Sequence, residues 1–128
     1  MAGIKKEYDV IIIGAGPSGI FCAYELMRRK PDLKVLMLEK GRSIEKRVCP
    51  KRKTKVCVGC KPCSITTGFA GAGAFSDGKL SLSPEVGGTL PEILGYEKAE
   101  ELIREADEIY LKFGADEKVY GLEDMEAI

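Results

Sequence analysis

Residues 8–19 of the chain read YDVIIIGAGPSG, and this stretch decides the fold. Its first half, 8–13, is a short, almost continuous apolar run, which is typical of a buried strand in a parallel sheet. Three glycines follow within six residues. The next segment, 20–30, reads IFCAYELMRRK and consists of good helix formers whose apolar side chains repeat at helical spacing. The sequence therefore predicts a strand, a tight glycine turn and a helix.

A second apolar run, KVLMLE at 34–39, follows the Pro-Asp pair that ends the helix. Strand, helix and strand together have the size of a mononucleotide-binding half unit. The predicted fold class is α/β, as the opening of a doubly wound, Rossmann-like domain. Such a domain usually has about five or six strands, and two are evident here, so we expect an incomplete domain. A truncated chain and one subunit of a split enzyme are both compatible with this.

The glycine turn has the features that dinucleotide binding requires. Gly14 permits the tight turn, Gly16 lets the backbone approach a pyrophosphate, and Gly19 allows the helix to pack closely on the strand. The helix N-terminus attracts the phosphates. Glu39, 20 residues beyond Gly19, is placed to accept hydrogen bonds from the ribose and repels a 2′-phosphate, which favours FAD or NAD over NADP. The predicted dinucleotide contacts of this unit are Gly14, Gly16, Pro17, Ser18, Gly19, Glu39 and Lys40.

Composition narrows the function classes. The chain has 128 residues, with 20 Lys and Arg, 20 Asp and Glu, and no His, so His-based triads, His ligands and His general bases are excluded. No apolar run reaches the roughly 20 residues of a membrane span, and 10–13 is too short for a signal peptide core. We therefore expect a cytoplasmic protein. Residues 28–63 carry 13 basic and 3 acidic side chains, whereas 85–128 carry 4 and 13.

Four cysteines lie within 15 residues, spaced C-x7-C-x2-C-x2-C. Four thiolates suit zinc or an iron–sulfur cluster. A redox-active or structural disulfide and reduced thiols without a ligand are the alternatives, and neighbouring Lys and Arg residues favour thiolates. Cys22 on the first helix is expected to be a small buried hydrophobe. The candidate metal ligands are Cys49, Cys57, Cys60 and Cys63.

A glycine-rich stretch, GFAGAGAFSDGK at 68–79, follows the cysteines, and its N–H groups can form an anion-binding nest. Apolar residues then repeat at helical spacing from Ala99 to Phe113, with Gly114 placed to close a helix. We therefore expect a dinucleotide-binding unit over 1–90, with a Cys-rich insert at about 46–66 and a Gly-rich loop at 68–88. Residues 91–128 are the helical start of a following region.

The segment DVIIIGAGPSGIFCAYEL closely resembles the N-terminus of the glutathione-reductase-like flavoprotein superfamily. The segments EKGRSIEKRVCP, CVGCKPCSI and GFAGAGAFSDGKLSLSPEVGG resemble one branch of it, the FAD-dependent dehydrogenases, over roughly 8–113. This resemblance implies FAD and redox chemistry but no substrate. It also implies that the Gly-rich stretch runs beside the pyrophosphate and the flavin ring. The flavin contacts that it adds are Gly71, Gly73, Ser76 and Gly78, with Lys79 as a candidate charge near a phosphate or flavin N1. Arg42 and Arg47, just past Glu39, are further candidates for contact with the pyrophosphate.

The sequence thus predicts the N-terminal FAD-binding part of a flavoprotein oxidoreductase, inactive alone and without an identifiable catalytic residue. One alternative is half of an NAD-binding dehydrogenase. Another is a four-cysteine metal module on a basic strip that binds nucleic acid, but no aromatic residue lies between Arg42 and Ile65 to stack on a base. The expected partners are FAD and the remainder of the enzyme or a partner subunit. Neither a membrane nor a nucleic acid is expected.

Overall fold

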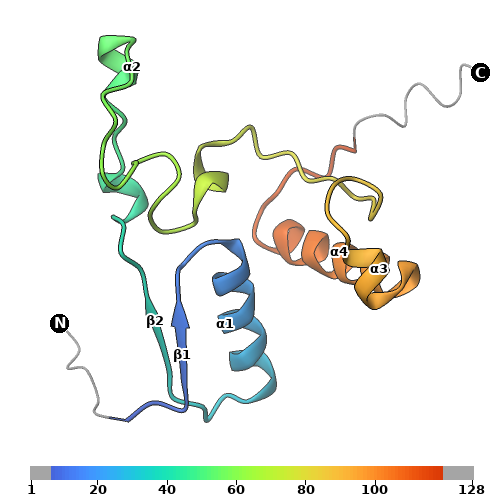
Figure 1. Ribbon diagram of the computed structural model, residues 1–128. Coiled ribbons are helices and arrows are strands. Elements are labelled where there is room, and N and C mark those ends of the chain that lie inside the picture. Colours follow the sequence, from blue (N-terminus) through green and yellow to red (C-terminus); the bar gives the residue numbers. More distant parts are fainter. Residues whose placement is uncertain (1–6, 120–128) are drawn as a thin grey trace, which may run out of the picture. The chain divides into compact units, whose positions relative to one another are not determined.

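A computed structural model describes residues 7–119 of the chain (Figure 1). The contacts divide the chain into two compact units, of which the first ends at Gly78 and the second begins at Lys79. This division lies earlier in the chain than the domain boundary expected at residue 90, which stays a prediction. Within the described part, no helix is long and apolar enough to cross a membrane.

The first unit is built on two parallel strands. Strand β1 spans Val10–Ile13 and strand β2 spans Val35–Leu38, with Val10 opposite Val35 and Ile13 opposite Leu38. Helix α1, Pro17–Arg29, connects them and lies alongside both strands (Figure 1). The α/β class and the strand–helix–strand order are therefore confirmed, with each element within a few residues of its predicted bounds.

The expected complete burial of the first strand is wrong for the described residues. Val10 and Ile12 are half-buried, whereas Ile11 is 55% and Ile13 is 86% exposed. Successive side chains of a strand point to opposite faces, and α1 is the helix that packs on this sheet in the described part. Among residues 7–119, no second helical layer of the kind found in a doubly wound sheet covers the face that carries Ile11 and Ile13.

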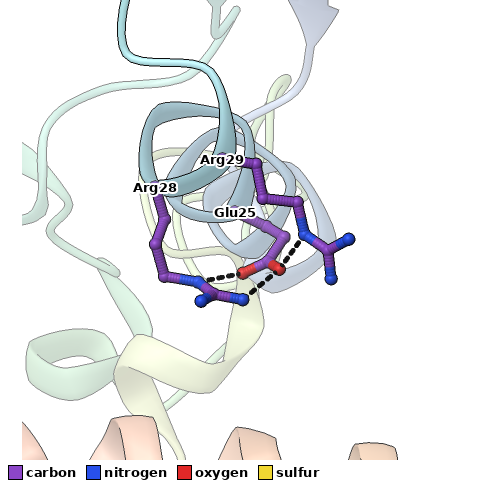
Figure 2. Close-up of polar contacts among 3 residues, drawn as sticks. All are labelled: Glu25, Arg28 and Arg29. Carbon is purple, nitrogen blue, oxygen red and sulfur yellow. Dashed lines mark hydrogen bonds and ion pairs between the residues drawn. The ribbon is translucent and has the colours of Figure 1, made fainter.

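Helix α1 ends in a small ionic cluster. Glu25 accepts hydrogen bonds from Arg28 Nε at 2.9 Å and Arg28 Nη2 at 2.6 Å, and from Arg29 Nε on its other side (Figure 2). Both arginines are in the last turn, where positive charge complements the helix dipole. On the same helix Cys22 is exposed, so its expected burial is wrong. The residue is about 200° around the helix from Ile20 and thus leaves the apolar stripe.

The rest of the first unit is irregular, as expected. Its regular elements are two short 3-10 turns, Ile44–Lys46 and Ala72–Phe75, and helix α2, Lys51–Thr54. The chain returns to the end of β2 through a parallel bridge between Arg42 and Gly68. This return brings the glycine-rich stretch to the edge of the sheet where both strands end.

Up to residue 119, the second unit contains two helices, α3 over Leu90–Leu94 and α4 over Tyr96–Lys112. Helix α4 confirms the predicted amphipathic helix, and Ala99 is fully buried in it. Gly114 follows the helix with a φ of +96°, which confirms its closing role. The break at Gly95, whose φ is +85° and ψ is 154°, was not anticipated.

Candidate functional site

A cavity of about 410 Å³ lies where β1 and β2 end. Three segments of the first unit line it: the end of β1 with the glycine turn, the end of β2, and the chain from residue 66 to residue 71. Five residues predicted from the sequence as dinucleotide contacts thus meet in one place. The lining residues are Ile13, Gly14, Gly16, Leu38, Glu39, Lys40, Thr66, Thr67, Gly68 and Gly71.

Each of the three positions in the turn favours glycine for a different physical reason. Gly14 has a φ of +101°, which side-chain-bearing residues rarely adopt. A Cβ on Gly19 would lie 2.1 Å from the carbonyl oxygen of Gly14, so this glycine is required for the helix to approach the turn. Gly16 differs, because its φ is −77° and a Cβ there would meet nothing within 4 Å. The chain itself gives no reason for glycine at 16, whereas a ligand lying close against the backbone does.

The N-terminus of α1 meets this cavity through Gly16, its N-cap residue. No side chain caps the helix, and no acidic residue lies in its first turn. The first turn, which contains Pro17, Ser18 and Gly19, therefore keeps its partial positive charge for an anion from outside the helix. A pyrophosphate fits these residues, because backbone N–H groups and a helix dipole recognise phosphate without side-chain charge.

Glu39 ties the end of β2 to the glycine turn. Its Oε2 accepts a hydrogen bond from the Ala15 N–H at 2.8 Å, and its Oε1 accepts one from the Gly41 N–H at 2.7 Å. These two bonds, Ala15 first and then Gly41, hold the pKa of the carboxyl below its ordinary value of 4.5. Glu39 is therefore ionised near neutral pH, and each oxygen retains a lone pair for a ligand hydroxyl.

The glycine-rich stretch forms one wall of the cavity by docking on the glycine turn. Ala70 N–H donates to the Ala15 carbonyl at 2.8 Å, and Phe69 N–H donates to the Arg42 carbonyl at 3.1 Å. A Cβ on Gly71 would lie 3.3 Å from Pro17 Cδ, so the two glycine segments are nearly in contact. The wall is thus held by the same turn that is expected to meet the pyrophosphate.

Two wall residues were missed from the sequence. Thr66 and Thr67 line the cavity and place hydroxyl-bearing side chains in an otherwise glycine-rich wall. The feature of the sequence that could have identified them is the pair of hydroxyl-bearing residues directly before Gly68, between the last cysteine and the glycine-rich stretch. Only the fold of the segment shows that this pair turns towards β2.

Other predicted contacts do not line the cavity. Ser76 Oγ donates to the Gly73 carbonyl at 2.9 Å and accepts from the Gly78 N–H at 3.1 Å, so these three residues form a local turn. Their role beside a flavin ring stays a prediction, as does that of Lys79.

Arg47 lies behind the wall and is only 4% exposed. Its Nε donates to the Ser64 carbonyl at 2.9 Å and its Nη2 donates to the Ile65 carbonyl. Its Nη1 donates to the carbonyls of Phe69 and Gly71 at 2.7 and 2.8 Å. The guanidinium is thus occupied by backbone oxygens, and its predicted phosphate contact stays a prediction.

The cysteines are not gathered into a metal site. All five carry free thiols, and residues 7–119 contain no group of three or more Cys, His, Asp or Glu placed to hold a metal. Metal binding by Cys49, Cys57, Cys60 and Cys63 therefore stays a prediction. Cys63 is nevertheless distinctive, because N–H groups of Thr66 and Ile65 and the Thr66 hydroxyl lower the pKa of its thiol.

Comparison with known proteins gives short but close similarities. The Thi4 family matches residues 4–46. The chain is 52% identical over 33 residues to a thiamine thiazole synthase of Coprinopsis cinerea, which covers 26% of this chain and 10% of that protein. It is 54% identical over 41 residues to a thioredoxin reductase of Listeria monocytogenes, which covers 32% of this chain and 12% of that protein.

The chain thus spans only about a tenth of the length of these curated relatives. No solved structure matches. The family match covers β1, α1 and β2, the elements that carry the glycine turn and Glu39. The chain is therefore similar, over the segment with the glycine turn and Glu39, to enzymes with two different names.

Proposed function

We propose that the chain is the N-terminal FAD-binding part of a flavoprotein oxidoreductase of the dehydrogenase type. The observation that carries this proposal is Gly16, a glycine that neither its conformation nor its packing requires, at the edge of a cavity that also contains Glu39. The similarity to both a thiazole synthase and a thioredoxin reductase supports a shared ligand-binding unit rather than either activity. The glutathione-reductase-like, doubly wound fold belongs to the same proposal.

Each part of the site has a defined task in this proposal. Gly16 allows the pyrophosphate to approach, and the N-terminus of α1 stabilises its charge. Glu39 accepts hydrogen bonds from the adenosine ribose, and Lys40 adds a positive charge at the cavity. The flavin, when bound, supplies hydride chemistry, while the protein orients it.

The alternative nucleotide is NAD, which uses the same glycine turn and the same acidic residue. The segments after the turn resemble the FAD-dependent dehydrogenases, so we favour FAD. Protein purified without added cofactor distinguishes the two, because bound oxidised flavin gives a yellow, two-band absorbance spectrum.

The test of the proposal compares two glycines of the same turn in the intact enzyme. Gly16→Val places a side chain in the open cavity, and we expect the thermal midpoint of the apoprotein to change little while FAD affinity falls at least tenfold. Gly19→Ala drives a Cβ into the Gly14 carbonyl, and we expect a lower thermal midpoint. Cys22→Val, on the exposed side of α1, is the control and should change neither.

Equilibrium dialysis with FAD and with NAD measures the affinities, and calorimetry measures the midpoints. Equal FAD affinity in the Gly16→Val variant and the parent would contradict the proposed site. Tight NAD binding in place of FAD would move the assignment to an NAD-binding dehydrogenase half.

A further inference from the structure

The wall of the cavity is folded around one buried cation. A buried guanidinium is costly unless its N–H groups are hydrogen-bonded. Four of the five N–H groups of Arg47 donate to carbonyl oxygens. Two of these carbonyls precede Gly68, and two follow it. The planar guanidinium of Arg47, here called the fork, therefore holds together the two sides of a bend in the chain. Gly68 lies at the centre of this bend.

The centre of the bend has no room for a side chain. Gly68 has a φ of +137°, and a Cβ there would lie 2.6 Å from Arg47 Cδ and 2.7 Å from the Arg42 carbonyl oxygen. The same Arg42 carbonyl accepts the Phe69 N–H at 3.1 Å. The backbone thus packs closely around the side chain of Arg47. At the same point it is hydrogen-bonded to Arg42, in the segment that follows β2.

An aromatic ring completes the surroundings of the guanidinium. Arg47 Cζ lies 4.7 Å from the centroid of the Phe75 ring, a cation–π distance. Arg52 Cζ lies 5.5 Å from the same centroid, but Arg52 is exposed. The two arginines share a ring and differ in burial and in backbone contacts, which makes Arg52 a matched control.

We propose that Arg47 is a positioning residue for the dinucleotide. Its fork fixes the segment Thr66–Gly71 as a wall of the cavity and thereby sets FAD affinity without contacting FAD. This inference rests on the proposed function, since it assigns a cause to the shape of that same site. In this role Arg47 does not act as a positive charge near the phosphates. It acts through the planar geometry of its hydrogen-bond donors, which only a guanidinium provides.

The two roles predict different behaviour of a lysine at position 47. A direct phosphate contact depends on charge, so Arg47→Lys would retain much of the affinity and its dependence on salt. A positioning role depends on the planar fork, because one ammonium group cannot reach four carbonyls on two sides of a bend.

The experiment uses the intact flavoprotein and its variants Arg47→Lys, Arg47→Met and Arg52→Met, with FAD as the probe at several salt concentrations. We expect both Arg47 variants to lose FAD affinity at least tenfold, with the slope of affinity against salt unchanged, while Arg52→Met binds like the parent. Rescue by lysine, or a salt slope that flattens in Arg47→Met, would overturn the proposal in favour of a phosphate contact. Arg47→Met that binds FAD like the parent would overturn both roles.

A parent protein that binds no FAD would instead refute the proposed function, so the two failures are distinguishable. If the Arg47 variants do not fold, Phe75→Leu provides the test, because it removes the ring that packs on the guanidinium and thereby loosens the hold of Arg47 on the wall. We expect it to weaken FAD binding several-fold and to speed hydrogen exchange at the Ala70 amide but not at Ile12 in β1. Unchanged affinity and unchanged exchange at Ala70 would contradict the proposal.

Discussion

At the residue scale, Glu39 is the side chain that links the end of β2 to the glycine turn beside the proposed nucleotide site. Its two oxygens each accept one backbone N–H, and those N–H groups belong to the glycine turn and to the residue after β2. The carboxylate therefore shapes the cavity and faces it at once. A group with both tasks is sensitive even to an isosteric change.

We expect Glu39→Gln to weaken FAD binding roughly tenfold, the scale of a hydrogen bond to a charged group. The amide has one oxygen, so its NH2 group must face either the Ala15 or the Gly41 N–H, donor against donor. Loss of the charge should also raise the relative affinity for a nucleotide with a 2′-phosphate. Isothermal titration with FAD and with NADP measures both effects. Undiminished FAD affinity would show that Glu39 serves only the turn.

The cluster at the end of α1 is a second residue-scale case, and it concerns pH. Hydrogen bonds from Arg28, and then from Arg29, lower the pKa of Glu25 from 4.5 to about 2 (Figure 2). Because the pKa in the folded state is depressed, the contribution to stability is present above pH 4.5 and is lost as pH falls towards 2.

NMR titration of the Glu25 carboxyl should therefore give a pKa near 2 in the parent and a higher value in Arg28→Gln. The pair is exposed, so salt should also raise the value. A Glu25 pKa close to 4.5 in the parent would contradict the geometry of the cluster.

At the scale of elements, local patterns predicted β1, α1, β2 and α4, because apolar periodicity and glycine punctuation act within a few residues. The surroundings of Arg47 escaped prediction, because its four carbonyl partners lie 17 to 24 residues away in an irregular segment. The sequence suggested only a cation that meets a phosphate, whereas its backbone contacts depend on the tertiary fold. Thr66 and Thr67 were missed for the same reason.

The break between α3 and α4 yields an element-scale prediction. Gly95 combines a φ of +85° with a ψ of 154°, a region essentially restricted to glycine. Its carbonyl also accepts the Ala99 N–H at 3.1 Å at the start of α4. We expect Gly95→Ala to destabilise the second unit by about 1–3 kcal/mol. Chemical unfolding followed by circular dichroism measures this, with Glu108→Ala on the exposed side of α4 as the control. Equal stability of the two variants would contradict the strain.

The cysteine segment, residues 49–63, has three alternative chemistries that an experiment can distinguish: metal binding, redox-active thiols and free thiols. A metal held by Cys49, Cys57, Cys60 and Cys63 would add folding energy to an irregular stretch. Elemental analysis should then give about one zinc, or iron with labile sulfide, per chain, and chelation should increase proteolysis within 49–63. Redox thiols would give no metal and a thiol count that changes by two on reduction. Five thiols and no metal under both conditions would leave Cys63 as a free cysteine whose thiol pKa is lowered by backbone N–H groups.

At the scale of the whole molecule, charge and structure divide the chain in similar places. The basic stretch 28–63 belongs to the unit that contains the cavity, and the acidic stretch 85–128 belongs to the unit with α3 and α4. A basic unit suits an anionic dinucleotide and attracts it at long range. The division supports a ligand-binding first unit and a second unit with a different task.

The last prediction concerns how much of the site the 128 residues supply. Ile11, Ile13 and Leu38 are 55%, 86% and 47% exposed, so nothing in the described part of the chain covers one face of the two-stranded sheet. Among the cavity residues, the proposal assigns Gly16, Glu39 and Lys40 to the pyrophosphate and the adenosine ribose, and only Gly71 is a predicted flavin contact. We therefore expect the isolated chain to bind FAD at least a hundredfold more weakly than the intact enzyme, and to bind ADP and FAD about equally.

Fluorescence titration with FAD and dialysis with ADP measure these affinities, and Gly16→Val in the isolated chain is the control that should abolish both. Tight, stoichiometric FAD binding by the isolated chain, well above its affinity for ADP, would show that these residues already enclose the flavin.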